Sequence, residues 1–170
     1  YLNGSLTSHQ TATIASSDTT KNDSWMVRVT PNDGYHDGPF AEATVVVENT
    51  APVISGPSIA PLSPSNSELL TCSFSSSDVD GETLTDTVTW TNMSSGATLG
   101  TGATLQLSPS LAVRGDVIEC LVETADADTV VYASVTETIS NSPPDAPVVA
   151  ITPNPAYSAS TLECLVSSAT

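Results

Sequence analysis

The chain is similar to itself at an offset of about 92 residues. The pairs matched at this offset include Ile59 with Ile151, Pro61 with Pro153, Leu70 with Leu162, and Cys72 with Cys164. Offsets of 93 and 89 extend the similarity to residues 23–29 with 116–122 and to residues 1–3 with 90–92. Self-similarity at a fixed period indicates tandem copies of one structural unit. We therefore expect a repeating unit of about 92 residues.

Within the unit, short apolar runs alternate with polar residues, as in half-buried strands. The clearest runs are residues 69–74, 84–90, 117–122 and 133–139, each flanked by Ser, Asp, Asn, Gly or Pro. The 12 prolines favour linkers and edge strands over helices. Regularly spaced short strands predict a β-sandwich, and about 92 residues is the length of an immunoglobulin-like one. We predict an all-β chain of tandem immunoglobulin-like β-sandwiches.

The repeat divides the chain unevenly. Residues 1–50 are expected to form the C-terminal half of one immunoglobulin-like repeat, residues 51–144 a complete sandwich, and residues 145–170 the N-terminal strands of the next repeat. Half a sandwich leaves strand edges unpaired and half a core exposed. We expect the chain to be a segment of a longer array, with strands supplied by neighbouring molecules as the second arrangement.

The charge balance excludes several partners. The chain has 19 acidic residues and three basic ones, Lys21, Arg28 and Arg114, for a net charge of −16. So few cations cannot neutralise a run of phosphates, which argues against nucleic-acid binding. Attraction to an anionic membrane surface fails for the same reason, and no apolar run is long enough to span a bilayer. We expect neither nucleic acid nor membrane insertion.

Three segments resemble extracellular immunoglobulin-like repeats of bacteria and archaea. Residues 22–34 (NDSWMVRVTPNDG) are similar to a strand signature of these repeats, and residues 49–52 (NTAP) to their interdomain joint. Residues 77–85 (SDVDGETLT), followed by Trp90, resemble a turn that PKD-like and cadherin-like modules share. The second copy departs from this pattern at Ile118 and at residues 123–128. The resemblance implies an extracellular or cell-surface location and a structural or adhesive role.

The cysteines fit the same resemblance. Cys72 and Cys120 lie at the centres of two predicted strands, and Trp90 lies between them in the sequence. This order resembles the Cys…Trp…Cys arrangement of immunoglobulin domains and implies a disulfide between the sheets. The alternative, a reactive thiol or a metal ligand, lacks a CxxC spacing or a neighbouring histidine. Cys164 is then expected to pair with a residue outside the chain, in an oxidising compartment.

An acidic turn is the candidate metal site. Asp78, Asp80 and Glu82 place carboxylates at alternate positions beside Gly81, and Ca²⁺ takes several such oxygen ligands. The alternative is a turn in which the aspartates bond to their own backbone. Weaker candidates lie in two other predicted turns: Asp33, Asp37, Asp126 and Asp128. Calcium is the one candidate cofactor.

Three Asn-x-Ser triplets are candidate N-glycosylation sites. Their acceptors are Asn3, Asn22 and Asn92, and Asn3 and Asn92 occupy equivalent places in two copies, where we expect exposed loops. Chance occurrence is the alternative, because the chain is rich in Ser and Thr. Ser73 and residues 75–77 are candidates for O-linked sugar.

The sequence offers little for catalysis. His9 and His36 are the two histidines, and neither lies beside a nucleophile motif. We expect a non-enzymatic extracellular structural protein whose repeats build a filament, stalk or surface layer. Its partners would be copies of itself or flanking repeats, with covalent glycans where the acceptors are used. The alternative function is a calcium-dependent adhesin segment, or a carbohydrate-binding or spacer module of a secreted enzyme.

Overall fold

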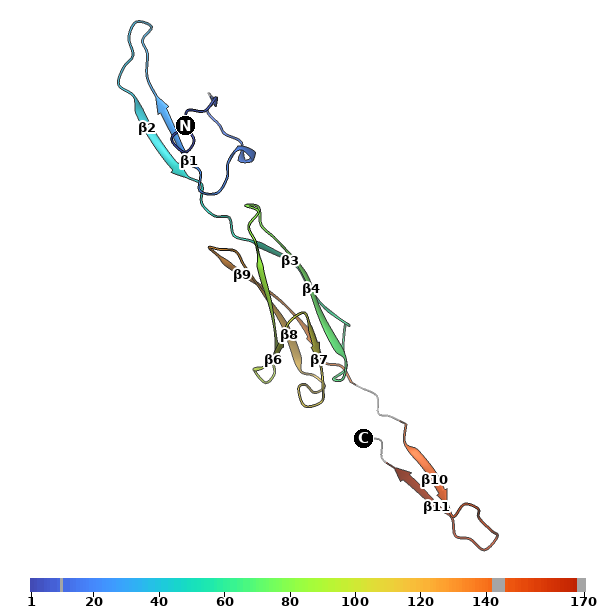
Figure 1. Cartoon of the computed structure of the whole chain (residues 1–170). Coiled ribbons are helices and arrows are strands. Elements are labelled where there is room, and N and C mark those ends of the chain that lie inside the picture. Colours follow the sequence, from blue (N-terminus) through green and yellow to red (C-terminus); the bar gives the residue numbers. More distant parts are fainter. Residues whose placement is uncertain (10, 142–145, 168–170) are drawn as a thin grey trace.

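The computed structural model describes residues 1–9, 11–141 and 146–167, which form three parts in a row (Figure 1). A β-sandwich lies in the middle, with a two-stranded hairpin at each end. The regular structure consists of strands and one short 3₁₀ turn, η1 (Ser16–Asp18), and every strand pairing in the described ranges is antiparallel. The prediction of an all-β chain is confirmed. No helix within those ranges is long and apolar enough to cross a membrane.

The middle part is built from two antiparallel sheets. Its strands are β3 (Val53–Ala60), β4 (Leu69–Ser77), β5 (Thr85–Asn92), β6 (Ala97–Thr101), β7 (Thr104–Gln106), β8 (Val117–Ala125) and β9 (Val130–Thr138). One sheet has the order β3-β4-β7 and the other β6-β5-β8-β9. The four runs that the alternation predicts as strands overlap β4, β5, β8 and β9. Alternation thus locates the strands that carry most of the core.

The core lies between the two sheets and follows the period of two. Along β8, Ile118, Cys120 and Val122 are buried, and the residues between them are partly exposed. Trp90 on β5 is fully buried beside its ladder partner Cys120 and donates its indole N–H to the carbonyl of Gly102 at 2.8 Å. The remaining buried apolar residues of the cluster are Ile59, Leu70, Cys72, Val88, Leu105, Leu107, Ala112 and Ile139.

A disulfide joins the two sheets through this core. It links Cys72 of β4 to Cys120 of β8, the pair that the Cys…Trp…Cys pattern implies, with a Cα–Cα distance of 6.4 Å. Cys164 is exposed and has a free thiol.

Each end of the chain carries one hairpin. At one end, β1 (Ser24–Val29) pairs with β2 (Ala41–Val46), and Leu2 forms an isolated bridge with Trp25 of β1. At the other end, β10 (Val148–Thr152) pairs with β11 (Glu163–Ser167). The expected boundary between residues 144 and 145 lies outside the described residues. So do residues 142–144, which are most of the segment NSPP (141–144) that matches NTAP (49–52) at the offset of 92.

The end hairpins repeat the strand registers of the sandwich. Ile151 pairs with Cys164 in β10–β11, as Ile59 pairs with Cys72 in β3–β4. In the same way, the β1–β2 pair Val27–Ala43 corresponds to the β8–β9 pair Cys120–Val135. The offset of 92 to 93 residues in the sequence therefore recurs in the pairing of the strands.

Candidate functional site

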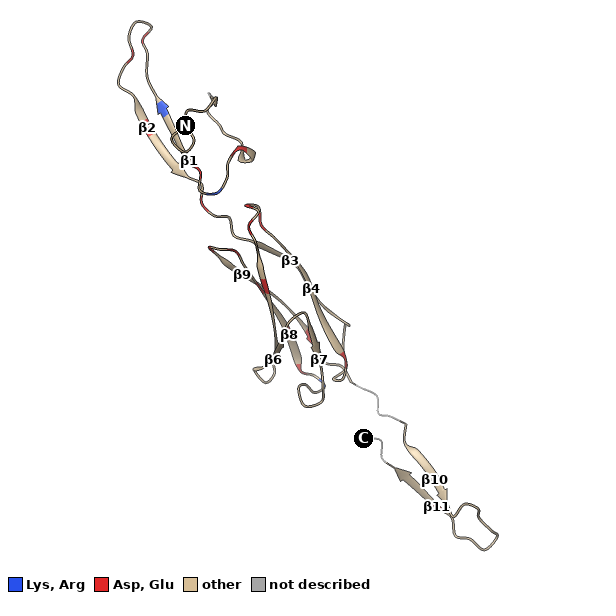
Figure 2. Cartoon of the chain, viewed as in Figure 1, with Lys and Arg blue, Asp and Glu red and all other residues tan. Residues whose placement is uncertain are grey.

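The acidic turns of the sandwich lie at the end that faces β1 and β2 (Figure 2). One turn, residues 78–82, connects β4 to β5, and the other, residues 126–129, connects β8 to β9. Each turn is closed locally by an aspartate: the backbone N–H of Asp80 donates to Asp78 Oδ1 at 2.6 Å, and that of Asp128 donates to Asp126 Oδ1 at 2.7 Å. Gly81 has a φ of +74°, a conformation that side chains other than glycine rarely adopt. We call these two turns, with the residues of 1–50 that contact them, the joint.

Lys21 connects the two acidic turns to the N-terminal part. Its ammonium lies 2.6 Å from Glu82 Oε2 and also forms an ion pair with Asp128, and 14% of its side chain is exposed. The hydrogen bonds to Asp128 and to Glu82 raise the pKa of Lys21 above its ordinary value. A raised pKa means that this ion pair favours the assembled joint until the pH rises through that pKa. One cation therefore bridges carboxylates from both turns.

Asn49 and Thr50 add neutral contacts at the same place. Asn49 Nδ2 donates to Asp126 Oδ2 at 3.0 Å, and the backbone N–H of Thr50 donates to Asp80 Oδ2 at 2.7 Å. The bond from Asn49 and those from Thr129 and Asp128 lower the pKa of Asp126, while partial desolvation opposes them. A lowered pKa means that this contribution is present above the ordinary carboxyl range and is lost on acidification. At neutral pH, the joint is therefore stabilised by hydrogen bonds and ion pairs between the N-terminal part and the two acidic turns.

The candidate calcium ligands are part of this joint. One carboxylate oxygen each from Asp78, Asp80 and Glu82 lies within 4.8 Å of the other two, a spacing that a single cation could bridge. Asp78 Oδ2 is buried and has no hydrogen-bond partner among the described residues, and the same is true of Asn49 Oδ1. The structure thus brings the three predicted residues together, next to the ammonium of Lys21.

The four weaker candidates separate into two places. Asp126 and Asp128 belong to the joint, as described above. Asp33 and Asp37 lie in the loop between β1 and β2, where Asp33 Oδ1 accepts the backbone N–H groups of Tyr35 and His36 at 2.9 Å. These bonds lower the pKa of Asp33. Asp37 Oδ1 accepts a bond from Asn32 Nδ2. Asp33 and Asp37 therefore stabilise the β1–β2 loop through hydrogen bonds within the loop.

The expectation that Asn92 is exposed is wrong. Its side chain is 2% exposed because it lies on the core face of β5, two positions after Trp90. Its Nδ2 donates to Asp116 Oδ2 at 2.8 Å and to the Leu111 carbonyl at 3.2 Å. The amide that would carry a glycan is therefore enclosed in the folded sandwich, and Asn92 has a structural role.

The other two Asn acceptors are exposed. Asn3 donates from Nδ2 to Asp23 Oδ1 at 3.0 Å, the counterpart of the bond between Asn92 and Asp116. We call these two bonds the Asn–Asp clasp. Asn22 is exposed in the turn before β1, with a φ of +70°. Glycosylation of Asn3 and Asn22 stays a prediction.

The serines predicted to carry O-linked sugar lie along β4. Ser73, Ser75 and Ser77 are exposed because alternate residues of this strand point away from the core. Ser76 is partly covered and donates from its hydroxyl to Asp86 Oδ2 at 2.8 Å. The exposed face of β4 therefore offers three hydroxyl groups in a row.

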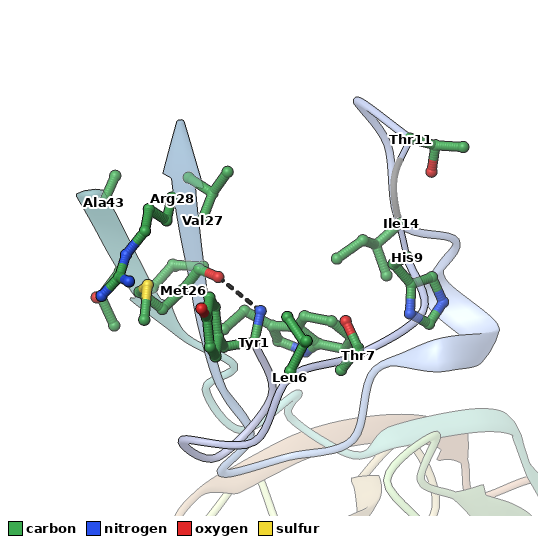
Figure 3. Close-up of a pocket in the computed structure, with 13 residues that line it drawn as sticks. Tyr1, Leu6, Thr7, His9, Thr11, Ile14, Met26, Val27, Arg28 and Ala43 are labelled. Carbon is green, nitrogen blue, oxygen red and sulfur yellow. Dashed lines mark hydrogen bonds between the residues drawn. The ribbon is translucent and has the colours of Figure 1, made fainter. Parts of the chain in front are cut away.

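The N-terminal part contains an open apolar hollow of about 390 Å³. Val27 of β1 and Ile14 face it from opposite sides, and Leu6 lies near its floor (Figure 3). Trp25 is 7% exposed and lines the hollow; its indole N–H has no acceptor among the described residues. The position of Val27 corresponds to that of Cys120 in the sandwich core. At this register position, the hollow thus corresponds to the core side of β8 in the sandwich.

Exposed aromatic side chains do not form a common surface. Tyr35 lies in the β1–β2 loop, Tyr132 on β9, and Tyr157 in the β10–β11 loop, so the three belong to different parts of the chain (Figure 1). Phe40 is covered on one side by the Arg28 guanidinium, 4.4 Å from the ring centre. His9 lies 3.4 Å from Asp18 and edge-on to Trp25.

Sequence reasoning did not find Lys21 or Asn49. A signal for Lys21 was present, because a basic residue in so acidic a chain has many carboxylates available as partners. Neither a family model, nor a curated protein, nor a solved structure matches the chain.

Proposed function

We propose that this chain is a non-enzymatic structural protein of the cell exterior. In this proposal, tandem immunoglobulin-like sandwiches form a linear array that serves as a filament, stalk or surface layer. The observation that carries it is the recurrence of one strand register in separate parts of the chain: Ile59–Cys72 recurs as Ile151–Cys164. Units that repeat in this way contact only their neighbours along the chain and build extended assemblies.

The joint supports the mechanical side of this proposal. Two successive units of an array keep a fixed relative orientation only if their connection resists bending. Here Lys21, Asn49 and Thr50 of one unit bind carboxylates of two separate turns of the next. Contacts to two turns restrain rotation in two directions, where a single contact would leave a hinge. The joint therefore favours a stiff connection.

The disulfide and the exposed surface agree with a location outside the cell. Structural disulfides persist in oxidising compartments, and Cys72–Cys120 lies in the core, where it supports the fold. A charge of −16 keeps neighbouring arrays apart and soluble.

Immunogold electron microscopy of intact source cells tests this function. Antibodies raised against the 170-residue chain are expected to label the outer surface or filaments that extend from it, without permeabilisation. Pre-immune serum and antibodies pre-absorbed with the chain are the controls. Label that appears only after permeabilisation would place the protein inside the cell and reject the proposal.

The second candidate is a calcium-stiffened adhesin segment, with the ion bound at Asp78, Asp80 and Glu82. What favours it is the buried oxygen of Asp78, which has no partner among the described residues and lies beside two further carboxylates. Because the Lys21 ammonium already neutralises Glu82, an ion would have to compete with it or shift it. This candidate differs from the first in requiring a divalent cation for the stiffness of the joint.

Thermal unfolding with and without calcium decides whether an ion binds. With a dissociation constant of about 0.1 mM, about 1 mM Ca²⁺ stabilises the folded chain by about 1.4 kcal/mol and raises the Tm by about 5 °C. Asp80→Asn keeps an oxygen for the N–H of Thr50 but removes a charged ligand, so its Tm should not respond. A wild-type Tm that is the same in Ca²⁺ and in chelator rejects the calcium candidate and leaves the structural proposal standing.

A further inference from the structure

The two end hairpins expose complementary apolar faces. On β10–β11, Ile151 is 61% exposed, whereas its counterpart Ile59 is 3% exposed in the sandwich. On β1, Val27 is 56% exposed, whereas its counterpart Cys120 is fully buried. In each case the same position of the same register is covered in the middle part and bare at the end. Each hairpin therefore exposes an apolar face whose counterpart is buried in the core of the sandwich.

The sandwich shows which face covers which. In it, the sheet that contains β3 and β4 packs against the sheet that contains β8, and the Cys72–Cys120 disulfide joins them. The register places β10–β11 in the role of β3–β4, and β1–β2 in the role of β8–β9. The molecule thus contains its own template for the way in which β10–β11 would pack on β1–β2.

These two faces lie at opposite ends of residues 1–170 (Figure 1), so they do not meet within this segment. We propose that the β10–β11 hairpin of one copy docks on the open hollow beside β1–β2 of a second copy and completes a composite sandwich. The proposal rests on the proposed structural function and names the partner of its array. The contact is head to tail, and because each copy keeps one free hairpin, it builds open linear chains.

Side-chain chemistry agrees with this occupant. The β10–β11 face that carries Ile151 also carries Val149, Val166 and Cys164, and it contains no charge. The hollow is lined by apolar side chains such as Leu6, Ile14 and Val27, together with His9, Arg28 and three threonines. The buried indole N–H of Trp25 lacks an acceptor among the described residues. Because both molecules are strongly acidic, apolar docking has to act against repulsion, and added salt should strengthen it.

The template makes a pairwise prediction that disulfide trapping can test. Val27 corresponds to Cys120, and Cys164 corresponds to Cys72, so Val27→Cys should place a thiol opposite Cys164 of a second copy. Under mild oxidation we expect a ladder of covalent oligomers on non-reducing gels that collapses with reductant. Mass mapping should identify a link between the introduced thiol at position 27 and Cys164. Val27→Cys combined with Cys164→Ala should give no ladder.

Ser24→Cys is the matched control. Ser24 lies on β1 three positions before Val27, so its side chain is on the opposite face of the hairpin, and it is not among the residues that line the hollow. In a docked pair, Cys164 should link to the thiol introduced at position 27 at least about tenfold faster than to the one introduced at position 24. Equal rates, or links only between two Cys164 thiols, would mean random collision and overturn the proposal.

Sedimentation velocity of the unmodified chain provides a test without new cysteines. We expect oligomers that grow with concentration and salt, and we expect the Ile151→Asp variant to stay monomeric with an unchanged sandwich. A wild-type chain that is monomeric at all concentrations also overturns the docking. That outcome leaves the surface-labelling test untouched, because repeats joined within one polypeptide would still build an array. Conversely, oligomers together with intracellular label would reject the proposed function and keep the docking.

Discussion

Replacement of both Cys72 and Cys120 by alanine is expected to lower the free energy of unfolding of the sandwich by about 4 kcal/mol. The two cysteines are 48 residues apart in the sequence, and the chain-entropy estimate for a loop of this length is about 4 kcal/mol. Since single domains are stable by only about 5–15 kcal/mol, the loss would leave a marginal fold. Guanidinium denaturation followed by tryptophan fluorescence measures the effect, because Trp90 lies next to Cys120.

Cys164→Ala is the control for this experiment. The residue is exposed on β11, away from the sandwich core, and its thiol is free, so the sandwich should unfold at the wild-type midpoint. A loss below about 1 kcal/mol in the double variant would contradict the prediction, since it falls well short of the loop-closure estimate. It would mean that apolar packing around Trp90 holds the two sheets together without a covalent link.

Asn92→Ala is expected to destabilise the sandwich by about 3 kcal/mol, because it leaves buried polar groups without partners. The Asn92 side chain donates to Asp116 and to the Leu111 carbonyl, and its Oδ1 accepts the N–H groups of Ser94 and Ser95. Without the amide, the pKa of Asp116, which its bond to Val113 N–H and then the bond to Asn92 hold low, should rise toward its ordinary value. Denaturant unfolding and an NMR titration of Asp116 measure the two effects.

Ser94→Ala separates a structural role from glycosylation. It destroys the Asn-x-Ser triplet but leaves the Asn92 amide in place, at the cost of the bond that Ser94 Oγ accepts from Val117 N–H. We expect a loss of about 1 kcal/mol or less. If Ser94→Ala and Asn92→Ala were equally destabilising in glycosylated material, the sugar rather than the buried amide would carry the effect.

The strands were predictable because each sheet has one face in the core. In β4 and β8, apolar residues had to recur at every second position, and residues 69–74 and 117–122 fall within these two strands. The disulfide partners were named from the resemblance to the Cys…Trp…Cys order of immunoglobulin domains, and the structure agrees, since both cysteines lie on the inward face. The alternation in β5 also indicated that Asn92 is buried, because Val88 and Trp90 precede it on the same face of the strand. The triplet beginning at Asn92 favoured the opposite interpretation.

The joint could not be predicted from a local pattern. Lys21 contacts Glu82 and Asp128, which lie 61 and 107 residues away in the sequence. No periodicity records such a contact, since it depends on how one unit is oriented on the next. The acidic turn at 78–82 was visible in the sequence, but its partner was not. Composition revealed the surplus of carboxylates and left open which of them a cation would neutralise.

The Asn–Asp clasp encloses segments of different length in the N-terminal part and in the sandwich. It joins residues 20 positions apart in the N-terminal part and 24 positions apart in the sandwich. The intervening segment is therefore four residues shorter in one copy, although both ends are anchored in the same way. Length variation confined between two fixed anchors marks a permissive insertion point. In the proposed array, a peptide epitope or a reporter placed at exposed residues between the two anchors, away from the buried Ala112 and the Leu111 carbonyl, would decorate every unit at one regular interval.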